Sequence, residues 1–264
     1  MATTTDVEIT QANRIQTLRF ARPEKKNALT GDMYRALADA LIAGDANSEV
    51  SVHIFVGSGG IFTAGNDIKE FLTAAQGHDQ AGGGLLADVL RFIEVLPRVT
   101  KPMIAAVDGP AVGIGTTMLF HCDLVFASHC ATFATPFLDL GLVPEAGSSV
   151  LMPRRMGYAR AAQMLLLGET FTAEEMANAG VVNAVVARDE LEKVCYQGAQ
   201  KLAKKPPEAL ALARRLMRGS NVELEAAMKA ESEVFSRQMK SPEAQEAFQA
   251  FLEKRPANFS KVGS

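Results

Sequence analysis

A run of closely spaced glycines constrains this sequence more than any other feature. Residues 109–117 read GPAVGIGTT; they follow the apolar run 103–107 and precede a helical pattern that starts at Met118. This order predicts a strand, a tight turn and a helix start, because glycine lets the backbone turn sharply and pass close to a ligand. The first N–H groups of a helix are unpaired and lie at the positive end of its dipole, so the segment is suited to an anion.

A second glycine turn, FTAGND at residues 62–67, supports the same hypothesis. Either turn alone has a simpler explanation, since a glycine turn often serves only to pack a helix on a strand. The first turn is not a dinucleotide-binding fingerprint, because Met118 stands where the third glycine would be, and it lacks the Lys followed by Ser or Thr of a P-loop. The sequence thus predicts an anion-holding site without nucleotide-dependent chemistry.

Composition limits the possible partners. With 264 residues, 48% of them apolar, the chain can bury one large core. The net charge of -3, with lysines and glutamates interspersed, argues against nucleic acid, which needs a concentrated basic face. Cys122, Cys130 and Cys195 are odd in number and lack CxxC spacing, so we expect reduced core cysteines and no metal site.

The location of the protein is predicted from what the sequence lacks. The chain starts without the charged-then-apolar pattern of a secretion signal, and no apolar run approaches membrane-spanning length. We therefore expect a cytoplasmic protein with no membrane partner.

Apolar periodicity predicts strands that alternate with helices early in the chain and helices alone later. The expected strands are 7–10, 15–20, 52–57, 103–107, 124–127 and 132–134. The expected helices start at 30 and 67 and then cover 85–99, 158–167, 173–179, 190–204, 206–218, 222–239 and 242–253. Residues 73–84 and 136–147 are expected loops, the first of them mobile. Ser148 and Ser149 are expected to cap a helix, and His121 to be a hydrogen-bonded core residue.

The order of these elements predicts two regions. Residues 1–200 form an α/β core, and residues 201–264 form a C-terminal α-helical extension. Apolar residues on the late helices, such as Leu216, Phe235 and Phe251, exceed what a tail on a small core can bury. Such surface usually meets a partner, so the extension is expected to assemble a homotrimer or homohexamer.

Three segments together resemble the crotonase superfamily, also called the enoyl-CoA hydratase/isomerase family. They are Arg22-Pro23 with Asn27-Ala28-Leu29, then residues 62–69 (FTAGNDIK) and residues 109–115 (GPAVGIG). The resemblance covers nearly the whole chain. It implies a crotonase-type spiral of ββα repeats, a trimer or dimer of trimers, and acyl-CoA thioester substrates. It also implies that no cofactor is needed, since coenzyme A is part of the substrate.

The resemblance also implies which residues form the site. In that family two backbone N–H groups hold the thioester oxygen, and they correspond here to Asn66 and Ile114. Removal of a proton next to the thioester puts negative charge on this oxygen, and each preorganised donor contributes about 3 kcal/mol to its stabilisation. The residues that would contact substrate are Lys25, Lys26, Ala28, Ala64, Gly65, Asp67, Ile68, Gly113 and Phe137.

The acid and base residues depart from the hydratase pattern. Hydratases of the family carry two glutamates at positions that match Thr117 and Phe137. Residues 135–149 instead resemble the peroxisomal type of Δ3-Δ2-enoyl-CoA isomerase, whose single catalytic glutamate corresponds to Glu145. Hydration needs one group to activate water and another to deliver a proton, whereas one carboxylate can move a proton from C2 to C4. The apolar neighbours of Glu145 are expected to raise its pKa.

Alternatives remain open at this stage. Without the resemblance, Glu145 would be an ordinary turn residue, and Asp139 is a rival carboxylate that fits a structural turn equally well. Asp67 is expected to cap or orient its turn. The chain could also be a hydratase or a ring isomerase on the same scaffold, or an acyl-CoA-binding protein without activity.

Overall fold

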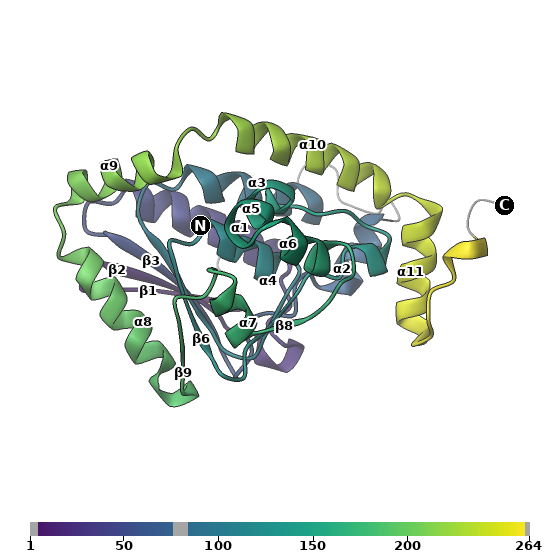
Figure 1. The fold of residues 1–264 in the computed structure, drawn as a ribbon, viewed down its shortest axis with the longest axis horizontal. Helices are drawn as coiled ribbons and strands as arrows, with labels where there is room; N and C mark the ends of the chain where they lie inside the picture. The colour runs from purple at the N-terminus through teal and green to yellow at the C-terminus, as the bar shows by residue number, and fades with distance from the viewer. Residues whose placement is uncertain (1–4, 76–83, 262–264) are drawn as a thin grey trace.

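The computed structural model describes residues 5–75 and 84–261 (Figure 1). Within them, six strands form the main sheet in the order β1-β2-β3-β4-β6-β9. These strands are β1 Val7–Ala12, β2 Ile15–Phe20, β3 Val52–Gly57, β4 Met103–Val107, β6 Leu124–Ser128 and β9 Ala184–Val186. The hairpin β1-β2 is antiparallel and the other pairs are parallel. A smaller sheet joins β5 Pro110–Val112, β7 Thr132–Ala134 and β8 Phe171–Thr172.

Helices cover both faces of the main sheet. They are α1 Gly31–Ala46, α2 Ile68–Ala75, α3 Leu85–Val95, α4 Ile114–Thr117, α5 Ser148–Met156, α6 Tyr158–Leu165, α7 Ala173–Asn178, α8 Arg188–Ala203, α9 Pro207–Arg218, α10 Val222–Gln238 and α11 Pro242–Glu253. Helix α8 packs on one face, and α1 with α3 lies over the other (Figure 1). Strands β3 and β4 are therefore buried on both sides, which explains their nearly continuous apolar sequences.

The α/β architecture with a C-terminal helical extension is confirmed. All expected strands are present, but the sequence did not predict β5, β8 and β9, each of only two or three residues. Such short strands contain too few residues to show an alternating pattern. The boundary expected between residues 200 and 201 lies inside α8, so the helices of the extension begin at α9.

Several local predictions were wrong. The helix expected over 85–99 ends at Val95 and continues as the 3₁₀ turn Leu96–Arg98. The loop expected over 73–84 begins with the end of α2, and its remaining residues 76–83 lie outside the described residues. The chain has three free cysteines; Cys122 and Cys195 are buried as expected, but Cys130 is exposed.

The C-terminal helices bury a large part of their apolar surface against their own chain. Phe235 of α10 and Phe248 of α11 stack edge-on against Phe71 of α2, at ring distances of 6.0 and 5.9 Å. Six apolar residues of the α10–α11 region belong to the main core, namely Leu224, Met228, Phe235, Met239, Ala244 and Phe248. The extension is therefore also a cover for the core, which the sequence pattern could not distinguish from an oligomer contact.

Other apolar residues of the extension stay exposed. The exposed fractions reach 81% for Leu216, 88% for Met217 and 72% for Val222, at the junction of α9 and α10. In the described part of the chain, none of the helices is long and apolar enough to cross a membrane.

We expect this exposed apolar surface to be covered by further copies of the chain. Analytical ultracentrifugation at micromolar concentration should give three or six times the 28.2 kDa mass of one chain. Met217→Asp should lower the mass, because it places a charge in a surface that needs to be desolvated. A mass of one chain for the unmodified protein would contradict the expectation.

Candidate active site

One buried amide fastens the loop between β2 and α1 to the residues that lead into the glycine turn 62–67. Asn27 is fully buried and has a φ of 52°. Its Nδ2 donates to the carbonyl oxygens of Ser58 at 3.0 Å and Ile61 at 2.7 Å, and its Oδ1 accepts from the N–H of Arg22 at 2.9 Å. These bonds fix the backbone of residues 22–29 against residues 58–65.

The two glycine turns lie side by side. Thr63 and Ala111 form a parallel bridge, in which the N–H of Thr63 donates to the Pro110 oxygen and the N–H of Val112 to the Thr63 oxygen, both at 3.0 Å. A Cβ on Gly65 would lie 2.8 Å from the Val112 oxygen, so this close approach needs glycine. Two segments 48 residues apart, at 63 and 111, thus meet through their backbones.

Each turn ends in an unpaired donor. Gly65 and Gly113 have φ angles of 85° and 57°, which favour glycine, and they precede Asn66 and Ile114. Among the described residues, no acceptor in the protein pairs with the N–H of Asn66 or of Ile114. Both residues line the same cavity. Two neighbouring unpaired N–H groups can hold an oxygen that carries negative charge.

This cavity has a volume of about 890 Å³. All nine residues predicted to contact substrate line it: Lys25, Lys26, Ala28, Ala64, Gly65, Asp67, Ile68, Gly113 and Phe137. Arg22, Lys69 and Arg255 add further cationic side chains, and apolar residues such as Phe71 and Leu142 line other parts. The cavity can therefore take a ligand that is anionic in one part and apolar in another.

Sequence reasoning missed a wall of the cavity that comes from the extension. Phe235 of α10 lines it, together with five residues of α11, which are Ala247, Phe248, Ala250, Phe251 and Leu252, and with Arg255 and Ala257 from the segment that follows α11. The signal was present as an apolar pattern on these helices, but we assigned it to oligomer contacts alone. A periodic pattern indicates that a face is covered and does not indicate by what.

Glu145 is buried beside Thr117, the last residue of α4, and is not among the residues that line this cavity. It is 9% exposed, and its Oε1 accepts a hydrogen bond from the Thr117 hydroxyl at 2.5 Å. Burial raises the pKa of Glu145 to about 8, the Thr117 hydrogen bond opposes this shift, and the negative charge of Glu231 adds to it. A carboxyl with such a pKa can take up and release a proton near neutral pH.

Tyr34 of α1 belongs to the same group of side chains, although no sequence pattern singled it out. Its hydroxyl donates a short hydrogen bond to Oδ1 of Asn66, and its ring is fully buried. Burial raises the pKa of Tyr34 well above its usual value, and the charge of Glu145 adds to the effect. The phenol therefore stays protonated and fixes the side chain of a residue whose N–H is one of the two unpaired donors.

The segment that carries Glu145 is held at several points. Ala146 and Gly147 have φ angles of 56° and 74°. Nε2 of His121 donates to the Ala146 oxygen at 2.7 Å, and burial lowers the pKa of this histidine to about 4. The prediction of a hydrogen-bonded core histidine is thus confirmed. The N-cap of α5 is Gly147, so the prediction that Ser148 or Ser149 caps this helix was wrong.

The other two carboxylates, Asp139 and Asp67, line the cavity. Asp139 is exposed in the 3₁₀ turn Leu138–Leu140, as the structural alternative expected. Asp67 accepts from the N–H of Lys69 at 3.0 Å and pairs with Arg22 at 2.8 Å. Burial opposes the ionised form, but the bonds from Arg22 and from backbone N–H groups hold the pKa of Asp67 below its usual value. It orients its turn, as predicted.

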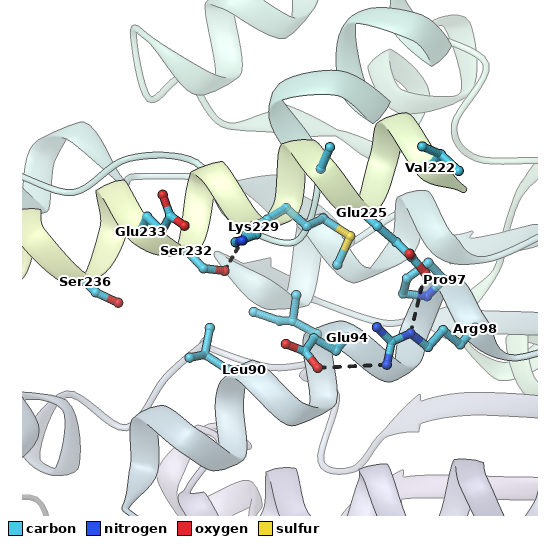
Figure 2. A pocket seen from close by; sticks show the side chains of 13 residues that line it. Leu90, Glu94, Pro97, Arg98, Val222, Glu225, Lys229, Ser232, Glu233 and Ser236 are labelled. Atoms are coloured by element: carbon cyan, nitrogen blue, oxygen red, sulfur yellow. Dashed lines mark hydrogen bonds and ion pairs between the residues drawn. The ribbon is translucent and has the colours of Figure 1, made fainter. Parts of the chain in front are cut away.

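A second cavity of about 760 Å³ lies between α3 and α10 (Figure 2). Three of its charged residues pair: Arg98 contacts Glu94 at 4.0 Å and Glu225 at 3.5 Å. It contains none of the predicted site residues. Across residues 5–75 and 84–261, no three His, Cys, Asp or Glu side chains gather in a way that could hold a metal ion.

With two unpaired backbone N–H groups on neighbouring glycine turns, the site belongs to the class of proteins that hold a negatively charged oxygen in a large cavity. Comparison with known proteins shows which family of this class the chain belongs to. The sequence matches the family described as enoyl-CoA hydratase/isomerase over residues 10–262. The chain belongs to this family, the crotonase superfamily, as the sequence resemblance predicted.

Individual relatives differ in activity. The chain is 35% identical over 249 residues to enoyl-CoA delta isomerase 2 of Rattus norvegicus, covering 94% of this chain and 63% of that protein. It therefore spans less than two thirds of the rat protein's length. The chain is also 31% identical over 253 residues to 2,3-dehydroadipyl-CoA hydratase of Escherichia coli (strain K12). This match covers 95% of this chain and 97% of that protein.

A solved structure confirms the crotonase-type fold. The enoyl-CoA hydratase/isomerase from Pseudoalteromonas atlantica T6c is 38% identical, with a TM-score of 0.90 over 97% of this chain and 100% of that one.

The role of the two donors can be tested at Asn66. Asn66→Pro removes the N–H and should lower turnover of an acyl-CoA substrate by about a hundredfold or more. Asn66→Ala is the matched control, because it also removes the Tyr34 contact but keeps the N–H; it should retain much of the activity. The test compares the steady-state turnover rates of the two folded variants. Equal losses of turnover would count against donation by the backbone N–H.

The raised pKa of Glu145 also predicts how stability depends on pH. The pKa of Glu145 is about 8 in the folded protein, above its usual value of 4.5, so unfolding releases a proton at pH values between the two. Stability from this group is therefore lost as pH rises through the window, by at most about 1.4 kcal/mol per pH unit. Glu145→Gln lacks this loss. Urea titrations from pH 5 to 8 should show the variant gaining stability over the wild type; a constant difference would contradict the raised pKa.

Proposed function

We propose that this chain is an acyl-CoA isomerase that moves a double bond from the 3-position to the 2-position. The observation that carries the proposal is a buried carboxyl, Glu145, bonded to Thr117 on the short helix that begins with one of the two unpaired backbone N–H groups, that of Ile114. The similarity of the chain to an enoyl-CoA delta isomerase of the rat supports the same activity.

The proposed reaction begins with the thioester oxygen bound to the N–H groups of Asn66 and Ile114. Glu145 takes the proton from C2, and the electron pair spreads over the thioester and the neighbouring double bond as a dienolate. The two donors stabilise the charge that develops on oxygen. Glu145 then returns the proton at C4, which leaves the double bond between C2 and C3 and the carboxylate restored. One base therefore completes the cycle without a redox cofactor or metal.

The side chains next to Glu145 favour this activity over hydration. Thr117 and Phe137 stand at the positions where hydratases of the family carry glutamates, and neither can activate water as a base at neutral pH. Phe137 is 6% exposed and is one of the residues that line the cavity. The second candidate is nevertheless a hydratase, because a dehydroadipyl-CoA hydratase matches the chain over 97% of its own length.

The remaining parts of the proposal concern the ligand and its setting. The phosphates of coenzyme A would bind near Lys25, Lys26 and Lys69, and the acyl chain would lie among the apolar residues. Lysine ammonium groups suit phosphate as point charges. A homotrimer or homohexamer and a cytoplasmic location also stay predictions.

The two candidates differ in relative rates. Hydration lacks a positioned proton transfer that is typically worth about 10²–10⁴-fold, so 2-enoyl-CoA should be hydrated slower than 3-enoyl-CoA is isomerised by roughly that factor. Both rates are measured on thioesters of equal chain length. Glu145→Gln is the control: it should abolish isomerisation and the exchange of the C2 proton in heavy water, with thioester binding kept. Hydration at or above the rate of isomerisation would withdraw the isomerase assignment.

A further inference from the structure

A carboxylate from the C-terminal extension reaches the segment that carries Glu145. Glu231 of α10 is only 9% exposed. Its Oε2 accepts from the N–H of Gly147 at 2.6 Å, and its Oε1 accepts from the N–H of Ser149 at 3.0 Å and from the Ser149 hydroxyl. The Glu231 side chain thus accepts hydrogen bonds from three donors just after Glu145. These donors belong to Gly147 and Ser149, which are 84 and 82 residues away in sequence.

These contacts replace a cap that the local sequence does not supply. The first N–H groups of an α-helix need partners from outside the helix. Helix α5 begins after Gly147, which has no side chain to accept from them. The preceding Ala146 has a φ of 56°, a conformation that L-residues rarely adopt. Residues 145–149 are therefore held by a local bond, from the Ser148 N–H to the Glu145 oxygen at 3.0 Å, and by contacts from distant parts of the chain.

We propose that Glu231 is a positioning residue: it holds the start of α5, and through it places the Glu145 carboxyl against Thr117 for proton transfer. This inference rests on the proposed function of Glu145 as the base. Thr117 fixes the side chain of Glu145 and His121 fixes the Ala146 oxygen, so Glu231 supplies the third anchor, on the far side of the segment. Placing a base correctly is a large part of its catalytic effect.

Glu231 acts on the base through its charge as well. Negative charge on Glu231 raises the pKa of Glu145. The other titratable side chains around the segment are Tyr34 from α1 and His121 from the 3₁₀ turn Met118–His121. Burial raises the pKa of Tyr34 well above its usual value and lowers the pKa of His121 to about 4, so both are neutral near pH 7. Glu231 is thus the charged neighbour of Glu145 in this group, and it makes the carboxylate a stronger base.

The inference gives α10 a role beyond covering the core. Helix α10 packs directly on α5 and also lines the cavity through Phe235. Its opposite side borders the second cavity, where Glu233 is exposed (Figure 2). Two glutamates that are two residues apart on one helix therefore differ in their environment, which provides a matched control.

The test replaces Glu231 by Gln in the full-length protein. Glu231→Gln keeps the size of the side chain but removes its charge and leaves only one oxygen for three donors. We expect kcat for 3-enoyl-CoA isomerisation to fall about tenfold to a hundredfold, while the Kd for a saturated acyl-CoA stays within about twofold. The acid limb of the kcat profile should move to lower pH by about half a unit or more, because the like charge is gone.

Two further variants make the result decisive. Glu233→Gln should keep the wild-type kcat and pH profile. Ser149→Ala removes one donor to Glu231 and should lower kcat a fewfold in the same direction; it carries the test if Glu231→Gln does not fold.

The inference is overturned if the folded Glu231→Gln variant keeps kcat within twofold of the wild type, if Glu233→Gln loses as much, or if the acid limb does not move. When Glu231→Gln does not fold, an unchanged kcat in Ser149→Ala overturns it. A wild-type protein without isomerase activity would contradict the proposed function instead. In that case the rate at which each variant exchanges the C2 proton of a saturated acyl-CoA in heavy water is measured instead. This rate tests whether Glu231 positions Glu145 independently of isomerase activity.

Discussion

The backbone bridge between Thr63 and Ala111 is the contact on which the site depends. Its two hydrogen bonds bring the glycine turns together, and the missing Cβ of Gly65 allows the approach to the Val112 oxygen. Because the donors that follow are backbone groups, their directions are set by these turns and not by flexible side chains. Such preorganisation makes stabilisation of a charged oxygen effective, since no further ordering is required when the charge forms.

Several parts of the fold serve to hold this bridge in place. The small sheet β5-β7-β8 continues from one glycine turn, and the fully buried Asn27 fastens the loop beside the other. Arg22 joins the same loop to Asp67 at 2.8 Å and to the Ala28 oxygen at 3.0 Å. The hydrogen bonds of these buried groups are satisfied within the protein, which avoids the cost of an unpaired polar group in the core.

The sequence was informative where a residue type is required by local geometry. The glycines at 65 and 113 have positive φ angles, and the pattern of Arg22, Asn27 and the two turns identified the family and the residues that line the cavity. Glu145 was found by resemblance, and its raised pKa was expected from its apolar neighbours. Tyr34, Glu231 and the wall from α11 were missed, because each reaches the site from an element remote in sequence.

The sequence by itself therefore predicted the α/β class from apolar periodicity, which is a local property of the chain. Its glycine turns, together with Arg22 and Asn27, indicated the family by resemblance, and the resemblance in turn implied the two backbone donors. The tertiary structure decided how Glu145 is held and charged, because burial and a hydrogen bond from Thr117 act only when distant segments meet. It also decided that α10 and α11 cover the core and the cavity of their own chain. An apolar helix face has the same pattern whether its partner is its own core or another molecule, and only the packing of Phe235 and Phe248 against Phe71 distinguishes the two.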